Sequence, residues 1–146
     1  MSFRKPKLLD KEMNSRLAIK IMLCLLVTVV LFHLCIVFKI ISYKITWGGR
    51  LKNDFEMYVF ESISILINLF LLFVLLIKGR YLKEIIPIKI INLILWAFLF
   101  LFGINTIGNI LAKTNFEKFF ALLTLAFTFL LWGILKKKKK QTDNIV

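Results

Sequence analysis

The segment from Ile45 to Asn68, which reads ITWGGRLKNDFEMYVFESISILIN, contains the change of character that decides the fold. Its first half is a polar loop with two adjacent glycines and several charged residues. Its second half is a long apolar segment that still carries Glu61. Because backbone inside hydrocarbon must satisfy its own hydrogen bonds, such a segment predicts a transmembrane helix entered from a polar loop.

The composition of the whole chain favours the same environment. Of the 146 residues 60% are hydrophobic, 15 are phenylalanine, and the mean hydropathy is +0.84, far more apolar than an ordinary soluble domain. The formal net charge is +13. The basic residues abut apolar segments and do not interleave with aromatic residues or zinc-ligand motifs. We therefore predict no nucleic acid and instead membrane lipids as partners, attracted by about 1 kcal/mol per basic residue.

Four apolar segments each reach the length of about 20 residues that a helix needs to cross hydrocarbon. The connections between them are short, which predicts an all-α fold, a four-helix transmembrane bundle in up-down-up-down order. The second segment stops at Lys78 and Arg80, and Gly79 between them is predicted to end the helix. We predict a basic cytoplasmic leader over residues 1–16, a four-helix transmembrane domain over 17–135 and a lysine-rich cytoplasmic tail over 136–146. The four spans are predicted at about 17–41, 55–77, 88–111 and 116–135.

The distribution of cations predicts the orientation. Of the 21 Lys and Arg residues, six lie at or before Lys20, four lie from Lys78 to Lys89, and five follow the fourth span. Fifteen cations therefore share one side and six remain for the other. The positive-inside rule then places both termini in the cytoplasm, N-in/C-in. The predicted localisation is the cytoplasmic (inner) membrane of a bacterial-type cell, as a multi-pass protein.

Polar residues within this topology gather toward the outer face. The outer loop is predicted to form a lid over them, and the polar groups inside the spans are candidates for function because burying them in hydrocarbon is costly. The candidate ligand-binding residues are His33, Trp47, Arg50, Glu61, Asn68, Asn105 and Asn109.

Glu61 is the most informative of these residues, because an ionised carboxylate in hydrocarbon needs a cation, a proton or an aqueous cavity. Three interpretations are open. Glu61 pairs with Lys or Arg at headgroup level as an interfacial anchor, or belongs to a ligand or ion site near His33, Lys39 and Arg50, or has a proton-coupled role. Trp47 is likewise either an interfacial aromatic anchor or part of the lid.

Motifs of known reactions are absent from the sequence, which has no HExxH, no GxSxG and no phosphate-binding loop. His33 is the only histidine and lacks a second soft ligand at helical spacing. Cys24 and Cys35 are separated by about 16 Å of helix, beyond the reach of a disulfide. We therefore expect no catalytic residue, no metal and no cofactor, and an enzyme is the less favoured class.

The segments WGGRL (47–51), FEMYVFES (55–62) and NTIGN (105–109) carry a resemblance. Over about Ile41 to Phe120 the chain resembles uncharacterised small four-span bacterial membrane proteins with a WGG-type outer loop, which have no assigned activity. In architecture alone it is similar to the sterol-isomerase and sigma-2-receptor superfamily. No catalytic residue is transferred from that superfamily, because no motif aligns.

Three functional hypotheses follow. In the first, the protein binds a lipid or small amphiphile, or a partner membrane protein, through the outer polar cluster. In the second, it is a small proton-coupled transporter or a transporter subunit, working as a homo-dimer because four helices alone form a thin pathway. In the third, it is a lipid-modifying enzyme, and this rests only on the architectural similarity.

The predicted orientation is testable with a reporter fused after Val146. We expect reporter activity in the cytoplasm, because the cation-rich side of a membrane protein faces inward. A periplasmic reporter would contradict the orientation. The polar residues would then no longer be predicted to lie together under the WGGR segment.

Overall fold

The structure is a computed structural model and describes residues 6–112 and 115–136. Within these ranges the chain contains only helices and their connections, which confirms the predicted all-α, four-helix fold class. Residues 1–5 of the predicted leader and residues 137–146 of the predicted tail lie outside the described residues. The elements are α1 (Pro6–Val37), the 3₁₀ turns η1 (Tyr43–Ile45) and η2 (Trp47–Gly49), α2 (Asp54–Lys78), α3 (Ile88–Ile110) and α4 (Asn115–Leu135).

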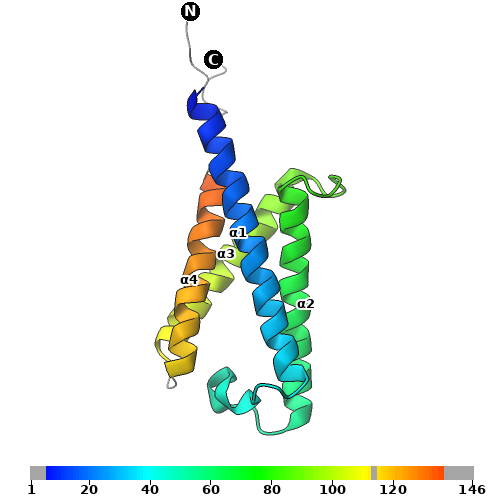
Figure 1. Ribbon diagram of the computed structural model, residues 1–146, viewed down its shortest axis with the longest axis vertical. Coiled ribbons are helices and arrows are strands. Elements are labelled where there is room, and N and C mark those ends of the chain that lie inside the picture. Colours follow the sequence, from blue (N-terminus) through cyan, green and yellow to red (C-terminus); the bar gives the residue numbers. More distant parts are fainter. Residues whose placement is uncertain (1–5, 113–114, 137–146) are drawn as a thin grey trace, which may run out of the picture.

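The four long helices alternate in direction. α1 begins and α4 ends at the same end of the molecule, where α2 is also connected to α3 (Figure 1). We call this the terminal end. The opposite end holds residues 38–53, which connect α1 to α2, and the point where α3 is followed by α4. We call it the loop end.

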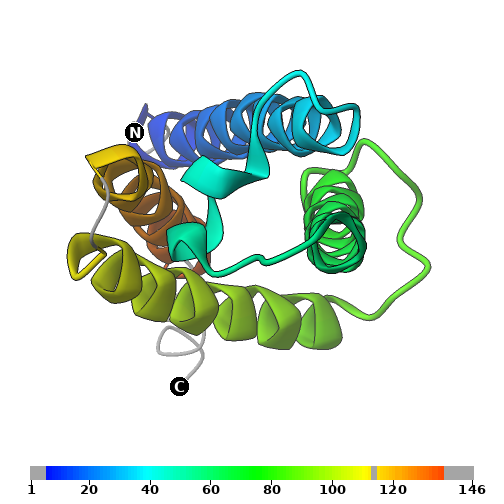
Figure 2. The same ribbon diagram turned by 90° about the horizontal axis from the view of Figure 1, so that it is seen from below.

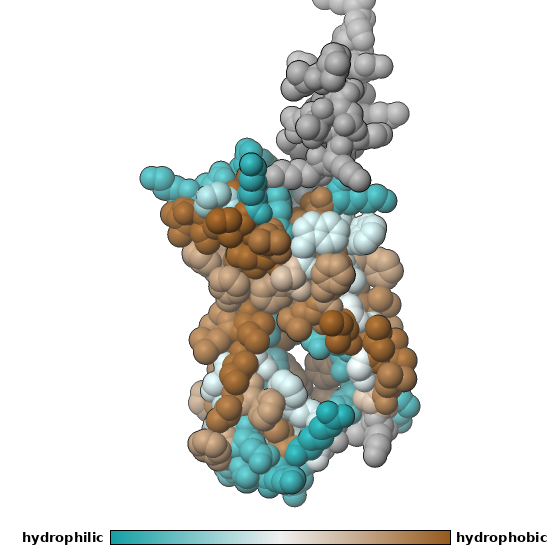
Figure 3. Space-filling view, turned by 180° about the vertical axis from the view of Figure 1, so that it is seen from behind, coloured by the Kyte–Doolittle hydropathy of each residue, from teal (hydrophilic) through white to brown (hydrophobic). Residues whose placement is uncertain are grey.

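Each of these four helices is long and apolar enough to cross a membrane. Between 22% and 33% of the residues in their most apolar windows are buried inside the protein, so most of the apolar surface requires an apolar surrounding. Figure 3 shows hydrophilic residues at both ends and a hydrophobic band between them. The chain is therefore an integral, multi-pass membrane protein.

The helices form two hairpins. α1 packs mainly against α2, and α3 packs most closely against α4. All four helices meet in a core that extends from the terminal end to about the middle of the bundle. Residues at the centre of this core are fully buried, one from each helix: Met22, Leu75, Leu95 and Leu131.

Toward the loop end the two hairpins diverge. The core there is smaller and involves only α1, the connecting loop and α2, through Ile36, Leu51 and Met57. Rings of Phe116 and Phe120 on α4 still contact Phe32 of α1. In Figure 3 an opening is visible between the helices in the half of the molecule nearer the loop end. The bundle is therefore packed less closely in this half than at the terminal end.

Candidate functional site

Glu61 lies in the third turn of α2, on the face that packs against α1. Asn53 is the N-cap of α2, and its side chain accepts a hydrogen bond from the Glu56 backbone N–H at 2.8 Å. This bond stabilises the start of the helix because it satisfies an N–H that has no partner within the helix. Met57 and Glu61 are one turn apart on the same face, and both are fully buried. Glu61 therefore faces the interior of the protein.

Both carboxyl oxygens of Glu61 have partners. Glu61 Oε2 lies 2.5 Å from His33 Nδ1 of α1, and Glu61 Oε1 accepts a hydrogen bond of 2.9 Å from the Trp47 indole N–H. We call these three residues the Glu61 cluster. The interpretation of Glu61 as an anchor paired with Lys or Arg is wrong, because its partners are an imidazole and an indole.

Hydrogen bonds join Glu61 to both of its partners. An indole N–H is a donor only, so Glu61 Oε1 is an acceptor in this pair. The contact between Glu61 Oε2 and His33 Nδ1 requires one proton, carried by either group. A buried carboxyl group is strongly disfavoured without hydrogen-bond partners, and His33 supplies a partner for Oε2. The His33 side chain is 16% exposed, whereas that of Glu61 is fully buried.

Trp47 adopts an unusual backbone conformation to reach Glu61. Its φ angle is 55°, in the left-handed region that bulky residues rarely occupy, and such a conformation costs about 1–3 kcal/mol. The Trp47 ring packs against Phe60 with centroids 5.1 Å apart. The indole hydrogen bond and this packing offset the strain. Trp47 therefore holds the loop to α2, although 39% of its surface remains exposed.

The segment around η1 and η2 covers the loop end of the bundle. Seen from that end, it crosses the middle of the space enclosed by the four helices (Figure 2). The segment is shaped by its own hydrogen bonds: the Thr46 hydroxyl and backbone N–H both donate to the Tyr43 carbonyl, and the Gly49 N–H donates to the Thr46 carbonyl. Gly49 also has a φ of 65°, which glycine adopts without strain. These turns place the Trp47 ring over Glu61.

The remaining candidate residues lie apart from the Glu61 cluster. Asn68 donates to the Ser64 carbonyl of its own helix at 2.8 Å, about two turns beyond Glu61. Arg50 and Asn105 are exposed and Asn109 is half-buried. Among the described residues none of these four side chains forms a hydrogen bond to His33, Trp47 or Glu61, although the Arg50 backbone N–H donates to the Trp47 carbonyl at 3.2 Å, at the end of η2. The structure thus brings together three of the seven predicted residues.

Lys39, considered in the sequence as a cation for Glu61, pairs with Asp54 at the loop end. Its Nζ lies 2.5 Å from Asp54 Oδ2, and both side chains are exposed. This hydrogen bond and the charge of Asp54 raise the pKa of Lys39 above its ordinary value. A raised lysine pKa stabilises the fold below the ordinary pKa and stops doing so as the pH rises through the shifted one. The contribution is small because the pair is exposed.

Two aromatic residues of the site were not predicted. Phe32 precedes His33 and contacts it edge-on, with ring centroids 5.9 Å apart, and Phe60 precedes Glu61 and contacts Trp47. Their position next to the polar residue in the sequence was the available signal. The two partners of the Glu61 carboxyl group are thus each packed against a phenylalanine ring, and aromatic rings can attract organic cations.

Comparison with known proteins gives no relative: no family model, no curated protein and no solved structure matches the chain. A metal centre also finds no support in residues 6–112 and 115–136, since no group of three His, Cys, Asp or Glu residues there is arranged to hold an ion. What the cluster can do chemically is accept a hydrogen bond or a cation on Glu61 and exchange a proton through His33.

The energetic role of the Glu61 cluster is testable by substitution. His33→Ala should lower the free energy of unfolding by about 3–5 kcal/mol, because it leaves a buried carboxyl group without its proton partner. Trp47→Phe should cost less, about 1–3 kcal/mol, because it removes one donor and keeps a ring. The measurement is reversible unfolding of the purified protein in mixed micelles, followed by circular dichroism.

Two further variants complete this test. His33→Leu/Glu61→Leu should be more stable than either single substitution, because it removes both buried polar groups together. Thr28→Val is the control, since the Thr28 hydroxyl bonds only to the Cys24 carbonyl one turn earlier in α1. A double variant no more stable than the singles would show that the pair is not coupled.

Proposed function

We propose that this membrane protein binds a small amphiphile at the loop end, with its head group at the Glu61 cluster and its apolar part between the two hairpins. The observation that carries the proposal is a fully buried carboxyl group, held by an imidazole and an indole from two other elements, in the half of the molecule where Figure 3 shows an opening. Ionisable residues at membrane depth are expensive and usually serve a site.

The chemistry of the cluster favours a head group that is cationic or a hydrogen-bond donor. Glu61 offers an acceptor, and the rings of Phe32, Trp47 and Phe60 lie beside or one residue from the polar groups. A cation over such rings is attracted by about 0.5–2 kcal/mol, more when it is desolvated. Because the indole occupies Glu61 Oε1, a ligand donor would take its place there. The loop carrying Trp47 then acts as a lid that is released by the ligand.

The orientation that suits this function is N-in/C-in in a bacterial-type cytoplasmic membrane, with the loop end facing outward. Support comes from the cations at the terminal end, where the exposed residues include Lys20, Arg80, Lys83 and Lys89. In this orientation an amphiphile would enter from the outer leaflet or the outer solution.

A second candidate function is proton-coupled transport of the same class of ligand. The observation that favours it is the 2.5 Å contact between His33 and Glu61, because a proton and a ligand cation would compete for one carboxyl group. The competition gives a coupling between binding and pH, and coupling of this kind is reciprocal. Transport would require a second open state and a pathway completed by another copy of the chain.

Native mass spectrometry of the gently extracted protein tests the binding proposal. We expect small molecules to co-purify with the wild type and to fall at least tenfold in Glu61→Gln, since this substitution removes the carboxyl acceptor. Trp47→Phe should retain them, because it removes the indole that competes for Glu61 Oε1. Asn105→Ala is the matched control and should retain them, because Asn105 is exposed and apart from the cluster. Gel filtration establishes that each variant is folded.

The outcomes of this experiment are distinct. An unliganded wild type, or equal occupancy in wild type and Glu61→Gln, would contradict the proposal and leave the Glu61 cluster as a structural link between helices. If bound molecules are found, uptake into liposomes separates the two functions. Proton-coupled transport predicts uptake that depends on a pH gradient and is lost in Glu61→Gln, whereas binding alone predicts an equal leak with and without the gradient.

A further inference from the structure

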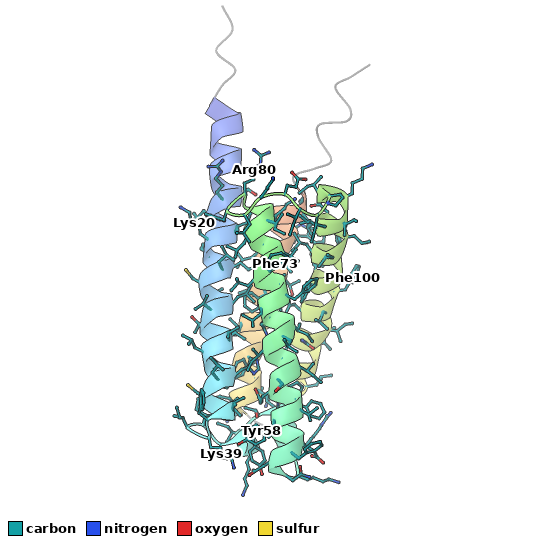
Figure 4. The ribbon with its side chains drawn as sticks, turned by 90° about the vertical axis from the view of Figure 1, so that its right-hand side faces the viewer. Lys20, Lys39, Tyr58, Phe73, Arg80 and Phe100 are labelled. Carbon is teal, nitrogen blue, oxygen red and sulfur yellow. The ribbon has the colours of Figure 1, made fainter. Side chains whose placement is uncertain are left out.

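A second site lies at the terminal end, far from the Glu61 cluster. A cavity of about 380 Å³ opens where α2 ends and the chain turns toward α3. Its walls combine two cations and one carboxylate with three apolar side chains: Lys78, Arg80, Glu84, Ile77, Leu82 and Ile88. In Figure 4, Arg80 lies at the same end as Lys20, opposite Lys39 and Tyr58. The cavity therefore lies at the depth of lipid headgroups, at the boundary of the second span.

Arg80 occupies a position at the end of α2 that glycine usually takes. Its φ angle is 61°, and two hydrogen bonds close the helix around it, from the Tyr81 N–H to the Leu76 carbonyl and from the Arg80 N–H to the Ile77 carbonyl. This is the pattern in which a left-handed residue terminates a helix. The sequence predicted that Gly79 would end the helix. Gly79 is the capping residue, but its own backbone is right-handed.

Close packing explains why the glycine is one residue earlier. A Cβ on Gly79 would lie 2.7 Å from ring atoms of Tyr81 and 3.2 Å from Ile19 Cγ2, so the glycine allows the Tyr81 ring to fold back over the helix end. The left-handed position consequently falls on Arg80. An arginine there is strained, and strain that persists at a cavity is a reason to look for a function of the side chain.

Lys39 is the equivalent left-handed residue at the end of α1. α1 ends in the same hydrogen-bond pattern, with Lys39 at a φ of 58°, and a cation suits the negative end of a helix in both cases. Lys39 is neutralised by Asp54. In contrast, the Arg80 side chain forms no hydrogen bond or ion pair with the residues that the structure describes, and Glu84 in the same cavity wall does not pair with it.

Lys78 contributes a second cation with a defined position. Its Nζ donates to Asn92 Oδ1 of α3 at 2.6 Å, which holds the ammonium group in the wall of the cavity. A guanidinium presents a planar fork of donors that matches phosphate oxygens, and an ammonium adds a point charge. Together the two cations provide a site for a phosphate group, and Ile77, Leu82 and Ile88 provide an apolar surface beside it.

We propose that this cavity, the Arg80 cavity, binds the phosphate headgroup of an anionic phospholipid from the leaflet at the terminal end. Inorganic phosphate carries the same negative charge but has no apolar part to contact the apolar wall of the cavity. A zwitterionic lipid carries a cationic group that Arg80 and Lys78 repel. The site does not involve the Glu61 cluster, so Glu61→Gln should leave it intact whether or not the proposed amphiphile binding is correct.

Lipid titration of the purified protein in a neutral detergent tests the proposal, read by native mass spectrometry. Wild type is expected to retain phosphatidylglycerol at least fivefold better than phosphatidylcholine. Arg80→Gly should lose this preference and yet unfold at the same or a higher temperature without lipid, because glycine adopts a positive φ without strain. Arg80→Asn is a second test variant, because asparagine also tolerates a positive φ, and it should likewise lose the preference for phosphatidylglycerol.

The matched control is Lys89→Gln, which removes an exposed cation at the same end that does not line the cavity. It should keep the preference for phosphatidylglycerol. An equal loss in Lys89→Gln and Arg80→Gly would overturn the proposal in favour of diffuse attraction to the basic end. Competition by inorganic phosphate at the concentration of the lipid would also overturn it, because the apolar wall would then contribute nothing.

Discussion

A carboxyl group buried among helices in hydrocarbon must be given a proton and hydrogen-bond donors, and the loop end of this protein is arranged around that requirement. Glu61 is hydrogen-bonded by two elements that are distant in sequence, through His33 of α1 and Trp47 of η2. The first contact fixes the pairing of α1 with α2. The second holds the connecting segment across the loop end, at the cost of a left-handed tryptophan.

The two ends of the bundle are held together by different contacts. At the terminal end all four helices share an apolar core, and polar contacts such as that of Lys78 with Asn92 join α2 to α3 at its edge. Between α3 and α4, the hydroxyls of Thr106 and Thr124 bond to each other at 2.9 Å. At the loop end α1 and α2 have their own small core and the Glu61 cluster, and the hairpins separate.

Much of this arrangement was predictable from the sequence. The four spans follow from hydropathy, because each is bounded by charges, glycine or proline, and Glu61 stood out because it is an acidic residue in an apolar segment. The partners of Glu61 were only partly predictable. His33 was among the candidates, but Lys39 and Arg50 were considered beside it, and the choice depends on which residues of α1 and the loop reach the buried face of α2. Helical periodicity does not contain that information.

The grouping of Asn105 and Asn109 near Glu61 relied on depth in the membrane alone. Depth places residues along the bundle axis but not around it, and among the described residues no hydrogen bond joins α3 to the Glu61 cluster. The left-handed backbone conformation of Trp47 and Arg80 could not be predicted from the sequence either, because tertiary packing at Glu61 and at Tyr81 imposes it.

The contact between His33 and Glu61 is the most direct object of a test, and the chain is suited to it because His33 is the only histidine. Protein labelled with ¹⁵N at histidine Nδ1 and ¹³C at the glutamate carboxyl carbons, reconstituted in lipid bilayers, allows this nitrogen to carbon distance to be measured by solid-state NMR. A strong dipolar coupling that disappears in Glu61→Gln prepared with the same labels is the expected result. A histidine nitrogen with no coupling to any glutamate carboxyl in the folded wild type would show that Glu61 does not hold α1 and the loop together.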